Sequence, residues 1–236
     1  MKAVILAGGM GTRLHPVTLE IPKPLIPVQG KTLTEHNFDL LKEAGITDII
    51  LSIGHMKDQI KEHYGDGKKF GIDLTYIEES EPLGTGGWLK LIDSIDDDFV
   101  VLNGDNLFDI DFRKMHAFHK QQQATITIAL REVQDVASRG VATLDSDRIT
   151  SFVEKPDPKE APSKYINGGY YIFSKKVFEY LPEEKKFMLE KDIFPKVAQD
   201  GKLFGFKSDA QWFDTGTFER WERVIKNWRK TDISGI

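Results

Sequence analysis

The 236-residue chain contains no cysteine. Disulfide bonds, thiolate-bound metals and a cysteine nucleophile are therefore excluded. No stretch approaches the ~18 consecutive apolar residues that a membrane-spanning helix requires. The apolar run near the N-terminus, from Ala3 to Ala7, is too short for a secretion signal, and Arg13 follows soon after it. We therefore expect a cytoplasmic protein that makes no membrane contact.

An excess of positive charge is also missing. Lysine and arginine number 32 against 37 aspartate and glutamate residues, which gives a formal net charge of -5. Proteins that bind nucleic acid present a basic face to the phosphate backbone, so we expect no nucleic-acid partner. Binding of a single nucleotide is still allowed, because a few cations and backbone N–H groups suffice for it.

The first half of the sequence alternates short apolar runs with helical patterns. Buried strands are predicted over residues 3–7, 46–53, 72–77 and 98–102. Helices are predicted over residues 34–44, 56–64 and 85–95. This alternation predicts an α/β fold with a Rossmann-like, mostly parallel sheet and helices on both faces.

The second half is a mixture of strands joined by turns and of further helices. Strands are predicted over residues 124–130, 140–144, 149–153, 169–173 and 203–206, and helices over 175–181, 188–199 and 217–229. No repeat or low-complexity linker separates the halves. We therefore expect a single domain over 1–236, with a first lobe at 1–110, a second lobe at 111–216 and a terminal helix at 217–230.

A glycine-rich loop follows the first predicted strand and ends at Arg13. In open α/β sheets, ligands bind beyond the carboxyl ends of the strands. Gly8, Gly9 and Gly11 would let backbone N–H groups approach a phosphate closely, and Arg13 adds a planar cation. A tight turn is the plainer alternative. The loop matches neither the dinucleotide-binding pattern GxGxxG nor the Walker pattern GxxxxGK[ST].

Three prolines within six residues surround Lys23. Pro22, Pro24 and Pro27 restrict the backbone and hold this lysine at a defined angle. Such rigidity suits a phosphate clamp, because positioning and charge neutralisation are most of what phosphoryl chemistry asks of a protein. Taken alone, the segment is explained better as a stiff loop with a solvated lysine.

Two aspartates follow predicted strands or turns. Asp105 comes soon after the strand at 98–102, and Asp214 lies in an Asp-Thr-Gly turn. Mg²⁺ prefers a few carboxylates together with phosphate oxygens and waters. Helix capping for Asp105 and turn formation for Asp214 are the alternatives. The two aspartates together with a phosphate loop favour a magnesium site.

These segments resemble the signature of the sugar-1-phosphate nucleotidyltransferases, the NDP-sugar pyrophosphorylases. The family pattern is LAGGxGTRLxPxT followed by PKPLxPV, and it stands here at Leu6–Thr18 and Pro22–Val28. Later family segments resemble Glu81–Gly87, Asn103–Asp105, Phe152–Pro156, Asn167–Gly169 and Trp212–Gly216. The resemblance therefore extends over almost the whole chain.

The resemblance implies a nucleotide-diphospho-sugar transferase fold without a β-helix extension. It also implies a Mg²⁺-dependent reaction of a nucleoside triphosphate with a sugar 1-phosphate, giving an NDP-sugar and pyrophosphate. The first lobe would bind the nucleotide and the second lobe the sugar. The implied catalytic residues are Arg13, Lys23 and Asp105, and the implied metal ligands are Asp105 and Asp214. The implied nucleotide-binding residues are Leu6, Ala7, Gly8, Gly9, Gly11, Thr12, Arg13, Glu81 and Gly84. The implied sugar-phosphate-binding residues are Gly140, Glu154, Lys155 and Asn167.

Among these enzymes the sequence is most similar to short guanylyltransferases for mannose or heptose 1-phosphate. Enzymes that use UTP or dTTP are the first alternative, although Lys23–Pro27 and Gly84–Gly87 depart from the thymidylyltransferase segments QLLP and GLAQA. A CTP:phosphocholine cytidylyltransferase would need an aromatic cage, for which Tyr165, Tyr170 and Tyr171 are candidates. A non-catalytic NDP-sugar-binding subunit is disfavoured, because Arg13 and Lys23 are present. Assembly into a homo-oligomer stays open.

Overall fold

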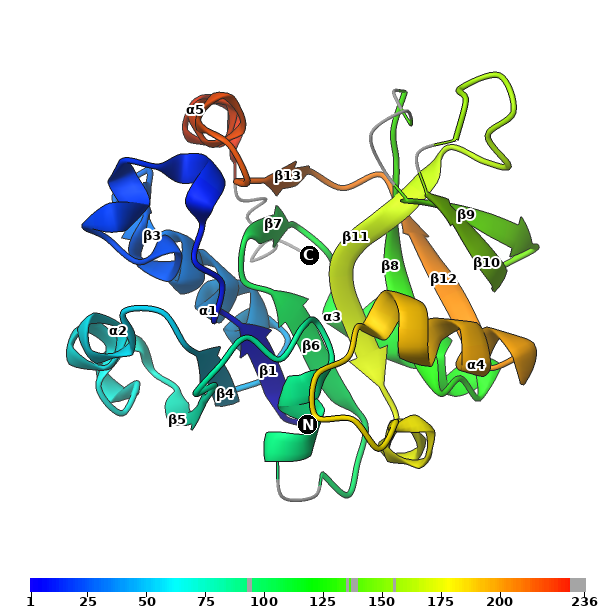
Figure 1. Ribbon diagram of the computed structural model, residues 1–236, viewed down its shortest axis with the longest axis horizontal. Coiled ribbons are helices and arrows are strands. Elements are labelled where there is room, and N and C mark those ends of the chain that lie inside the picture. The colour runs from blue at the N-terminus through cyan, green and yellow to red at the C-terminus, as the bar shows by residue number, and fades with distance from the viewer. Residues whose placement is uncertain (93–94, 135, 137–139, 155, 230–236) are drawn as a thin grey trace.

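A nine-stranded sheet crosses the molecule (Figure 1), with strand order β5-β4-β1-β6-β11-β8-β12-β10-β9. The computed structural model describes residues 1–92, 95–134, 136, 140–154 and 156–229. No helix in these ranges combines the length and the apolar character needed to span a bilayer.

The first half of the chain forms the parallel part of this sheet. Its strands are β1 (Ala3–Leu6), β4 (Asp48–Ile53), β5 (Asp73–Glu78) and β6 (Phe99–Asn103). Its helices are α1 (Leu33–Glu43) and α2 (Lys57–Tyr64). The predictions for these six elements are confirmed to within about two residues. A capping box fixes the start of α1, because Thr32 and Glu35 each accept a hydrogen bond from the backbone N–H of the other.

The second half adds mainly antiparallel strands. These are β8 (Ile126–Glu132), β9 (Gly140–Asp145), β10 (Arg148–Glu154), β11 (Tyr165–Phe173) and β12 (Leu203–Ser208). Strand β11 runs antiparallel to β6 on one side and to β8 on the other, so it joins the two halves into one sheet. The α/β class is confirmed, and the sheet is parallel in its first half but mixed as a whole. The difference arises because β9 and β10 form a hairpin and β11 returns against β6.

Short elements complete the fold. The remaining strands are β2 (Pro27–Val28), β3 (Lys31–Thr32), β7 (Asn106–Phe108) and β13 (Trp212–Asp214). The remaining helices are α3 (Phe112–Gln122), α4 (Phe194–Gln199) and α5 (Phe218–Asn227). A π-helical turn at Leu189–Ile193 leads into α4, and 3-10 turns lie at 12–14, 17–19, 23–25, 68–70, 87–91 and 175–180.

The helix predicted over 85–95 is wrong in extent and type. Within the described residues this region forms a 3-10 turn at Gly87–Leu91. The Gly86 N–H donates to the distant Phe187 carbonyl, and the Leu89 N–H donates to the Gly86 carbonyl three residues back, so the bonds of a first α-helical turn do not form here. The apolar residues Trp88 and Leu89 are nevertheless fully buried, so the segment contributes to the core without being an α-helix.

Alternate residues of each central strand pack on opposite faces of the sheet. In β1, Ile5 belongs to a cluster that includes Phe112 and Met115 of α3. Its neighbour Val4 belongs to a second cluster that includes Phe194 and Val197 of α4. This period of two places apolar layers on both faces, as a buried parallel strand requires.

One buried histidine should make stability depend on pH. His119 of α3 is only 2% exposed, and its Nδ1 lies 2.8 Å from the Thr127 hydroxyl of β8. Burial lowers the pKa of His119 to about 4, from an ordinary value of 6.5, although nearby Asp98 opposes the shift. The folded state therefore binds fewer protons than the unfolded state between these values. The contribution of His119 to the free energy of unfolding is therefore complete above pH 6.5. It decreases as the pH falls towards 4, by on the order of 2–3 kcal/mol.

Thermal unfolding measured from pH 7.5 to 4.5 checks this expectation. His119→Asn, which keeps a polar partner for Thr127 but does not titrate in this range, should flatten the decline in Tm below pH 6.5. His55→Asn changes an exposed histidine and is the matched control. A His119→Asn protein whose Tm falls as steeply as that of the wild type would contradict the assignment.

Candidate active site

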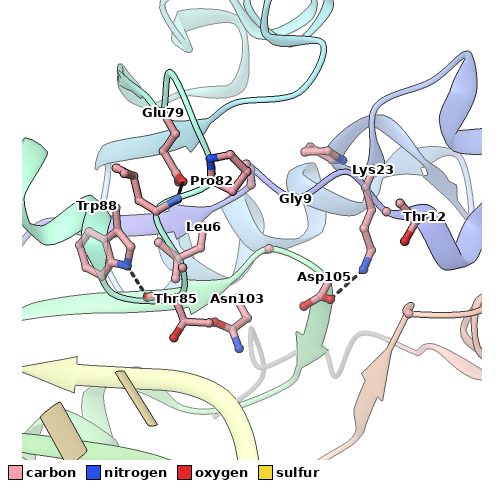
Figure 2. Close-up of a pocket in the computed structure, with 18 of the residues that line it drawn as sticks. Leu6, Gly9, Thr12, Lys23, Glu79, Pro82, Thr85, Trp88, Asn103 and Asp105 are labelled. Atoms are coloured by element: carbon pink, nitrogen blue, oxygen red, sulfur yellow. Dashed lines mark hydrogen bonds and ion pairs between the residues drawn. The ribbon is translucent and has the colours of Figure 1, made fainter. Parts of the chain in front are cut away.

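A cavity of about 440 Å³ lies at the carboxyl ends of β1 and β6 (Figure 2). Three stretches of the chain form most of its wall: the glycine-rich loop after β1, the loop at residues 82–88, and the turn after β6. Its lining residues are Leu6, Ala7, Gly8, Gly9, Gly11, Thr12, Arg13, Lys23, Pro24, Glu79, Pro82, Leu83, Gly84, Thr85, Trp88, Asn103, Gly104, Asp105 and Gly216. This is the edge of the sheet at which open α/β proteins bind ligands.

The glycine-rich loop passes close to other parts of the cavity wall. A Cβ on Gly8 would lie 3.0 Å from Glu79 Oε1. Gly11 has φ of 63°, and its carbonyl accepts a hydrogen bond of 2.9 Å from the Thr18 hydroxyl. The positive φ favours glycine at position 11, whereas at position 8 a larger residue would displace the Glu79 carboxylate. All seven residues that the sequence analysis assigned to nucleotide binding between Leu6 and Arg13 line the cavity.

Lys23 enters the cavity from a 3-10 turn at Lys23–Leu25. The carbonyl of Pro24 accepts a hydrogen bond of 3.0 Å from the Tyr64 hydroxyl, which ties this turn to α2. Lys23 Nζ lies 2.7 Å from Asp105 Oδ2 (Figure 2), and the lysine side chain is only 12% exposed. Because this ammonium group is largely shielded from water, the effective dielectric around it is lower, and each of its charge interactions is stronger than in bulk water.

Asp105 and Asp214 come together through the pairing of β7 with β13. Thr215 donates two hydrogen bonds to the Asp105 carbonyl, from its backbone N–H at 3.0 Å and from its hydroxyl at 2.9 Å. Asp214 Oδ1 accepts hydrogen bonds from Arg220 at 2.9 Å and from the Gly216 N–H at 3.1 Å. Asp105 lines the cavity, whereas Asp214 lies behind Gly216 at its rim.

Arg13 approaches the same rim. A Cβ on Gly216 would lie 3.1 Å from Asp214 Oδ1 and 3.2 Å from Arg13 Nη2. The described residues contain no group of three or more histidine or carboxylate side chains that could hold a metal ion. Two carboxylates are enough for Mg²⁺, which completes its coordination with substrate phosphates and waters. Asp105, which lines the cavity, and Asp214, at its rim, each supply a carboxylate of this kind.

The structure places Glu79 rather than Glu81 in the cavity wall. Glu81 is exposed and is not among the described residues that line the cavity. Glu79 lines it instead, because the N–H of Glu79 donates to the Ile53 carbonyl and continues the β5 ladder by one residue. Glu79 Oε1 accepts a hydrogen bond of 2.8 Å from the Ser52 hydroxyl, and Oε2 accepts one of 3.3 Å from the Leu83 N–H. The sequence analysis did not single out Glu79, although its position soon after the strand predicted at 72–77 was a signal that could have found it.

Three of the residues assigned to the sugar phosphate lie on neighbouring strands of the second lobe. Gly140 of β9 is the register partner of Glu154 in β10, and β9 also pairs with β11, which carries Asn167. Among the described residues that line the 440 Å³ cavity, neither Gly140 nor Asn167 is found. The fourth, Lys155, lies outside the described residues.

Tyr171 connects this second group to the cavity. Its hydroxyl accepts a hydrogen bond of 3.0 Å from Asn167 and one of 3.4 Å from Asn103, which lines the cavity. Burial raises the pKa of Tyr171, so its hydroxyl stays protonated. Tyr170 and Tyr171 are fully buried in different core clusters, so they do not form the exposed aromatic cage that a choline site would need.

Known proteins are similar in sequence to this chain over nearly its whole length. A family model described as nucleotidyl transferase matches residues 2–231. The chain is 35% identical to a UTP–glucose-1-phosphate uridylyltransferase of Synechocystis sp., covering 100% of this chain and 65% of the relative. It is 34% identical to a mannose-1-phosphate guanylyltransferase of Mycobacterium tuberculosis, covering 94% of this chain and 63% of the relative. The chain thus spans less than two thirds of the length of both curated relatives.

Two further comparisons cover both partners almost completely. A D-glycero-alpha-D-manno-heptose 1-phosphate guanylyltransferase of Aneurinibacillus thermoaerophilus is 36% identical, covering 96% of this chain and 97% of the relative. The crystal structure of HddC from Yersinia pseudotuberculosis complexed with GMP-PN superposes with a TM-score of 0.78 at 33% identity. That superposition covers 95% of this chain and 98% of the other.

Proposed function

Because this chain belongs to the nucleotidyl transferase family, we propose that it transfers a nucleotidyl group from a nucleoside triphosphate to a sugar 1-phosphate, releasing pyrophosphate. The observation that carries the proposal is the convergence of Arg13, Lys23 and Asp105 on one glycine-lined cavity. We propose a single domain over 1–236, in which residues 1–110 bind the nucleotide and 111–216 the sugar. The relatives named above act on the same classes of substrate.

The chemistry asks the protein to bring two polyanions together. A sugar-phosphate oxygen attacks the α-phosphorus in line with the leaving pyrophosphate, and since the nucleophile is already an anion, no strong base is needed. Two unit charges 4 Å apart repel by roughly 4 kcal/mol at an effective dielectric near 20. Fixed cations that are already in position remove this repulsion without reorganisation in the transition state.

Each cation has a distinct role in this proposal. Arg13 would bind the β- and γ-phosphates, and Lys23 would bridge the α-phosphate and the incoming phosphate. Lys155, together with Gly140, Glu154 and Asn167, would bind the sugar phosphate and sugar hydroxyls. Asp105 and Asp214 would hold Mg²⁺, whose chemistry here is to neutralise phosphate charge. The ion pair between Lys23 and Asp105 supports these roles, because it holds both side chains together in the cavity.

The wall formed by Glu79 favours guanine as the base. Both carboxylate oxygens hold one protein hydrogen bond each, which fixes the group and leaves acceptor capacity on each oxygen. Guanine presents two adjacent donors, N1–H and the N2 amino group, to such a carboxylate. Uracil and thymine present a single N–H flanked by two carbonyl oxygens, which a carboxylate repels. We therefore propose GTP as the nucleotide, with a mannose- or heptose-type sugar 1-phosphate.

A change of Glu79 tests the choice of base. In Glu79→Gln, one of the two acceptor oxygens becomes a donor, so the preference for GTP over UTP, measured as the ratio of kcat/KM values, should fall roughly tenfold or more. Glu62→Gln, which changes an exposed carboxylate on α2, is the matched control and should leave the ratio unchanged. An unchanged ratio in Glu79→Gln would show that the carboxylate does not read the base.

A substrate panel tests the reaction itself. Pyrophosphate release should be measured for GTP, UTP, dTTP and CTP with mannose, heptose and glucose 1-phosphates and with phosphocholine. The proposal expects the highest kcat/KM for GTP with mannose or heptose 1-phosphate. Highest activity with UTP or dTTP would keep the reaction class and overturn the base. Absence of pyrophosphate release with every pair, together with tight NDP-sugar binding, would indicate a non-catalytic subunit.

A further inference from the structure

The loop at residues 82–88, called the base loop below, packs backbone to backbone against residues 185–190 from the second lobe. A Cβ on Gly84 would lie 2.4 Å from the Phe187 carbonyl oxygen, and one on Gly87 would lie 2.4 Å from the Lys185 carbonyl oxygen. The Gly86 N–H donates to the Phe187 carbonyl at 3.0 Å. Because these glycines lack a side chain, the backbone of residues 185–190 can pack directly against the base loop.

A hydrogen-bond relay links this support to the cavity. The Leu189 N–H donates to the Thr85 hydroxyl oxygen at 2.9 Å, and the Thr85 hydroxyl donates to Glu190 Oε2 at 2.5 Å. Since a threonine hydroxyl has one proton and Leu189 already occupies an acceptor position, that proton is directed to the carboxylate. Thr85 lines the cavity, and its carbonyl accepts a hydrogen bond of 2.8 Å from the indole of Trp88 (Figure 2).

The segment that carries Glu190 has an unusual backbone. Leu189–Ile193 form a π-helical turn, a conformation found frequently at functional sites. The carboxylate of Asp192 caps the turn by accepting from the Met188 N–H at 2.7 Å. Burial and, after it, the negative charge of Glu190 raise the pKa of the Tyr171 phenol.

We propose that Glu190 is a positioning residue for nucleotide binding, which acts through Thr85 to hold the base loop in its binding conformation. The inference rests on the proposed function, because it assigns the nucleotide to this cavity. Glu190 is exposed, so the bond contributes no burial to the core. Its anionic acceptor makes the Thr85 bond stronger than one between neutral groups, which suits a contact that must fix one loop against another.

A set of four variants tests the relay: Thr85→Val, Glu190→Ala, the double variant and Thr85→Ser. GTP and UTP binding with Mg²⁺ should be measured by calorimetry, and KM and kcat by pyrophosphate release with mannose 1-phosphate. Thr85→Val and Glu190→Ala should each raise the Kd and KM for the triphosphate roughly tenfold, with kcat and the KM for the sugar phosphate nearly unchanged. The double variant should be no worse than either single variant. Thr85→Ser, which keeps the hydroxyl, should bind nearly as the wild type does.

Glu184→Ala, an exposed glutamate in the same segment, is the matched control and should change nothing. Additive losses in the double variant would overturn the relay, and so would a Thr85→Ser protein as weak as Thr85→Val. If the variants lowered Tm so far that unfolding alone explained the weaker binding, the hydrogen bond would serve only to stabilise the fold, and the proposal would be overturned. Wild-type protein that bound neither triphosphate would overturn the proposed function and this inference with it. Normal wild-type binding with unaffected variants would overturn this inference alone.

Discussion

Asp105→Ala should reduce pyrophosphate release to background while leaving the fold intact. The substitution removes the carboxylate that lies 2.7 Å from Lys23 and that is proposed to hold Mg²⁺ together with Asp214. The backbone carbonyl of Asp105, which Thr215 holds with two hydrogen bonds, remains, so the local structure should survive. The measurement is steady-state pyrophosphate release with saturating Mg²⁺, alongside circular dichroism and Tm.

Asp209→Ala is the matched control for this experiment. Asp209 is an exposed aspartate that follows β12 and does not line the cavity. It should keep the wild-type rate. A near-normal rate for Asp105→Ala with Mg²⁺ would remove Asp105 from the site and, with it, the proposed metal position.

Lys23→Ala should lower kcat by two or more powers of ten. The amine is proposed to neutralise charge that develops on the α-phosphate, and removal of one such contact from a preorganised site costs about 3 kcal/mol of transition-state stabilisation. KM for the triphosphate should rise less than kcat falls, because Arg13 and the glycine-rich loop would still bind the phosphates. Steady-state kinetics together with nucleotide binding by calorimetry separate the two effects.

Lys176→Ala, an exposed lysine remote from the cavity lining, controls for the loss of one positive charge. It should leave kcat unchanged. If Lys23→Ala raised only KM, the lysine would contribute to binding alone, and the proposed contact with the reacting phosphate would be wrong.

The central sheet was predictable because its strands are continuous apolar runs that end at glycine or polar residues. Strands β1, β4 and β6 were found this way, and so was the cavity edge, since the carboxyl ends of parallel strands meet there. Arg13, Lys23 and Asp105 follow those ends and line one cavity in the structure. Their chemical roles stay predictions until the variants are measured.

Elements that depend on distant partners carried no local signal. Strands β7 and β13 are three residues each, and they pair although residues 108 and 212 are far apart in the sequence. Helix α3 was not predicted, because its face is mostly polar and the buried His119 gives no apolar pattern. The loop at 82–88 resembled the start of a helix, but its shape is set by contact with residues 185–188.

Whether a given side chain faces the cavity was the property that the sequence predicted least well. Glu81 and Glu79 lie two residues apart, and only the former falls in the family-like segment. Which one faces inwards is decided by how far the β5 ladder continues past Glu78, and this is a property of its pairing with β4. Glu79 lines the cavity and Glu81 does not, and the local sequence carries no sign of that difference.

Strand β11 has a consequence for how the protein is made on the ribosome. It supplies the neighbour that β6 needs on one side and the neighbour that β8 needs on the other, yet it is translated after both. The first half of the chain therefore keeps an open hydrogen-bonding edge until synthesis has passed residue 173. Thr215, which secures Asp105, arrives later still. In a nascent chain the cavity should thus be complete only after synthesis has passed Gly216.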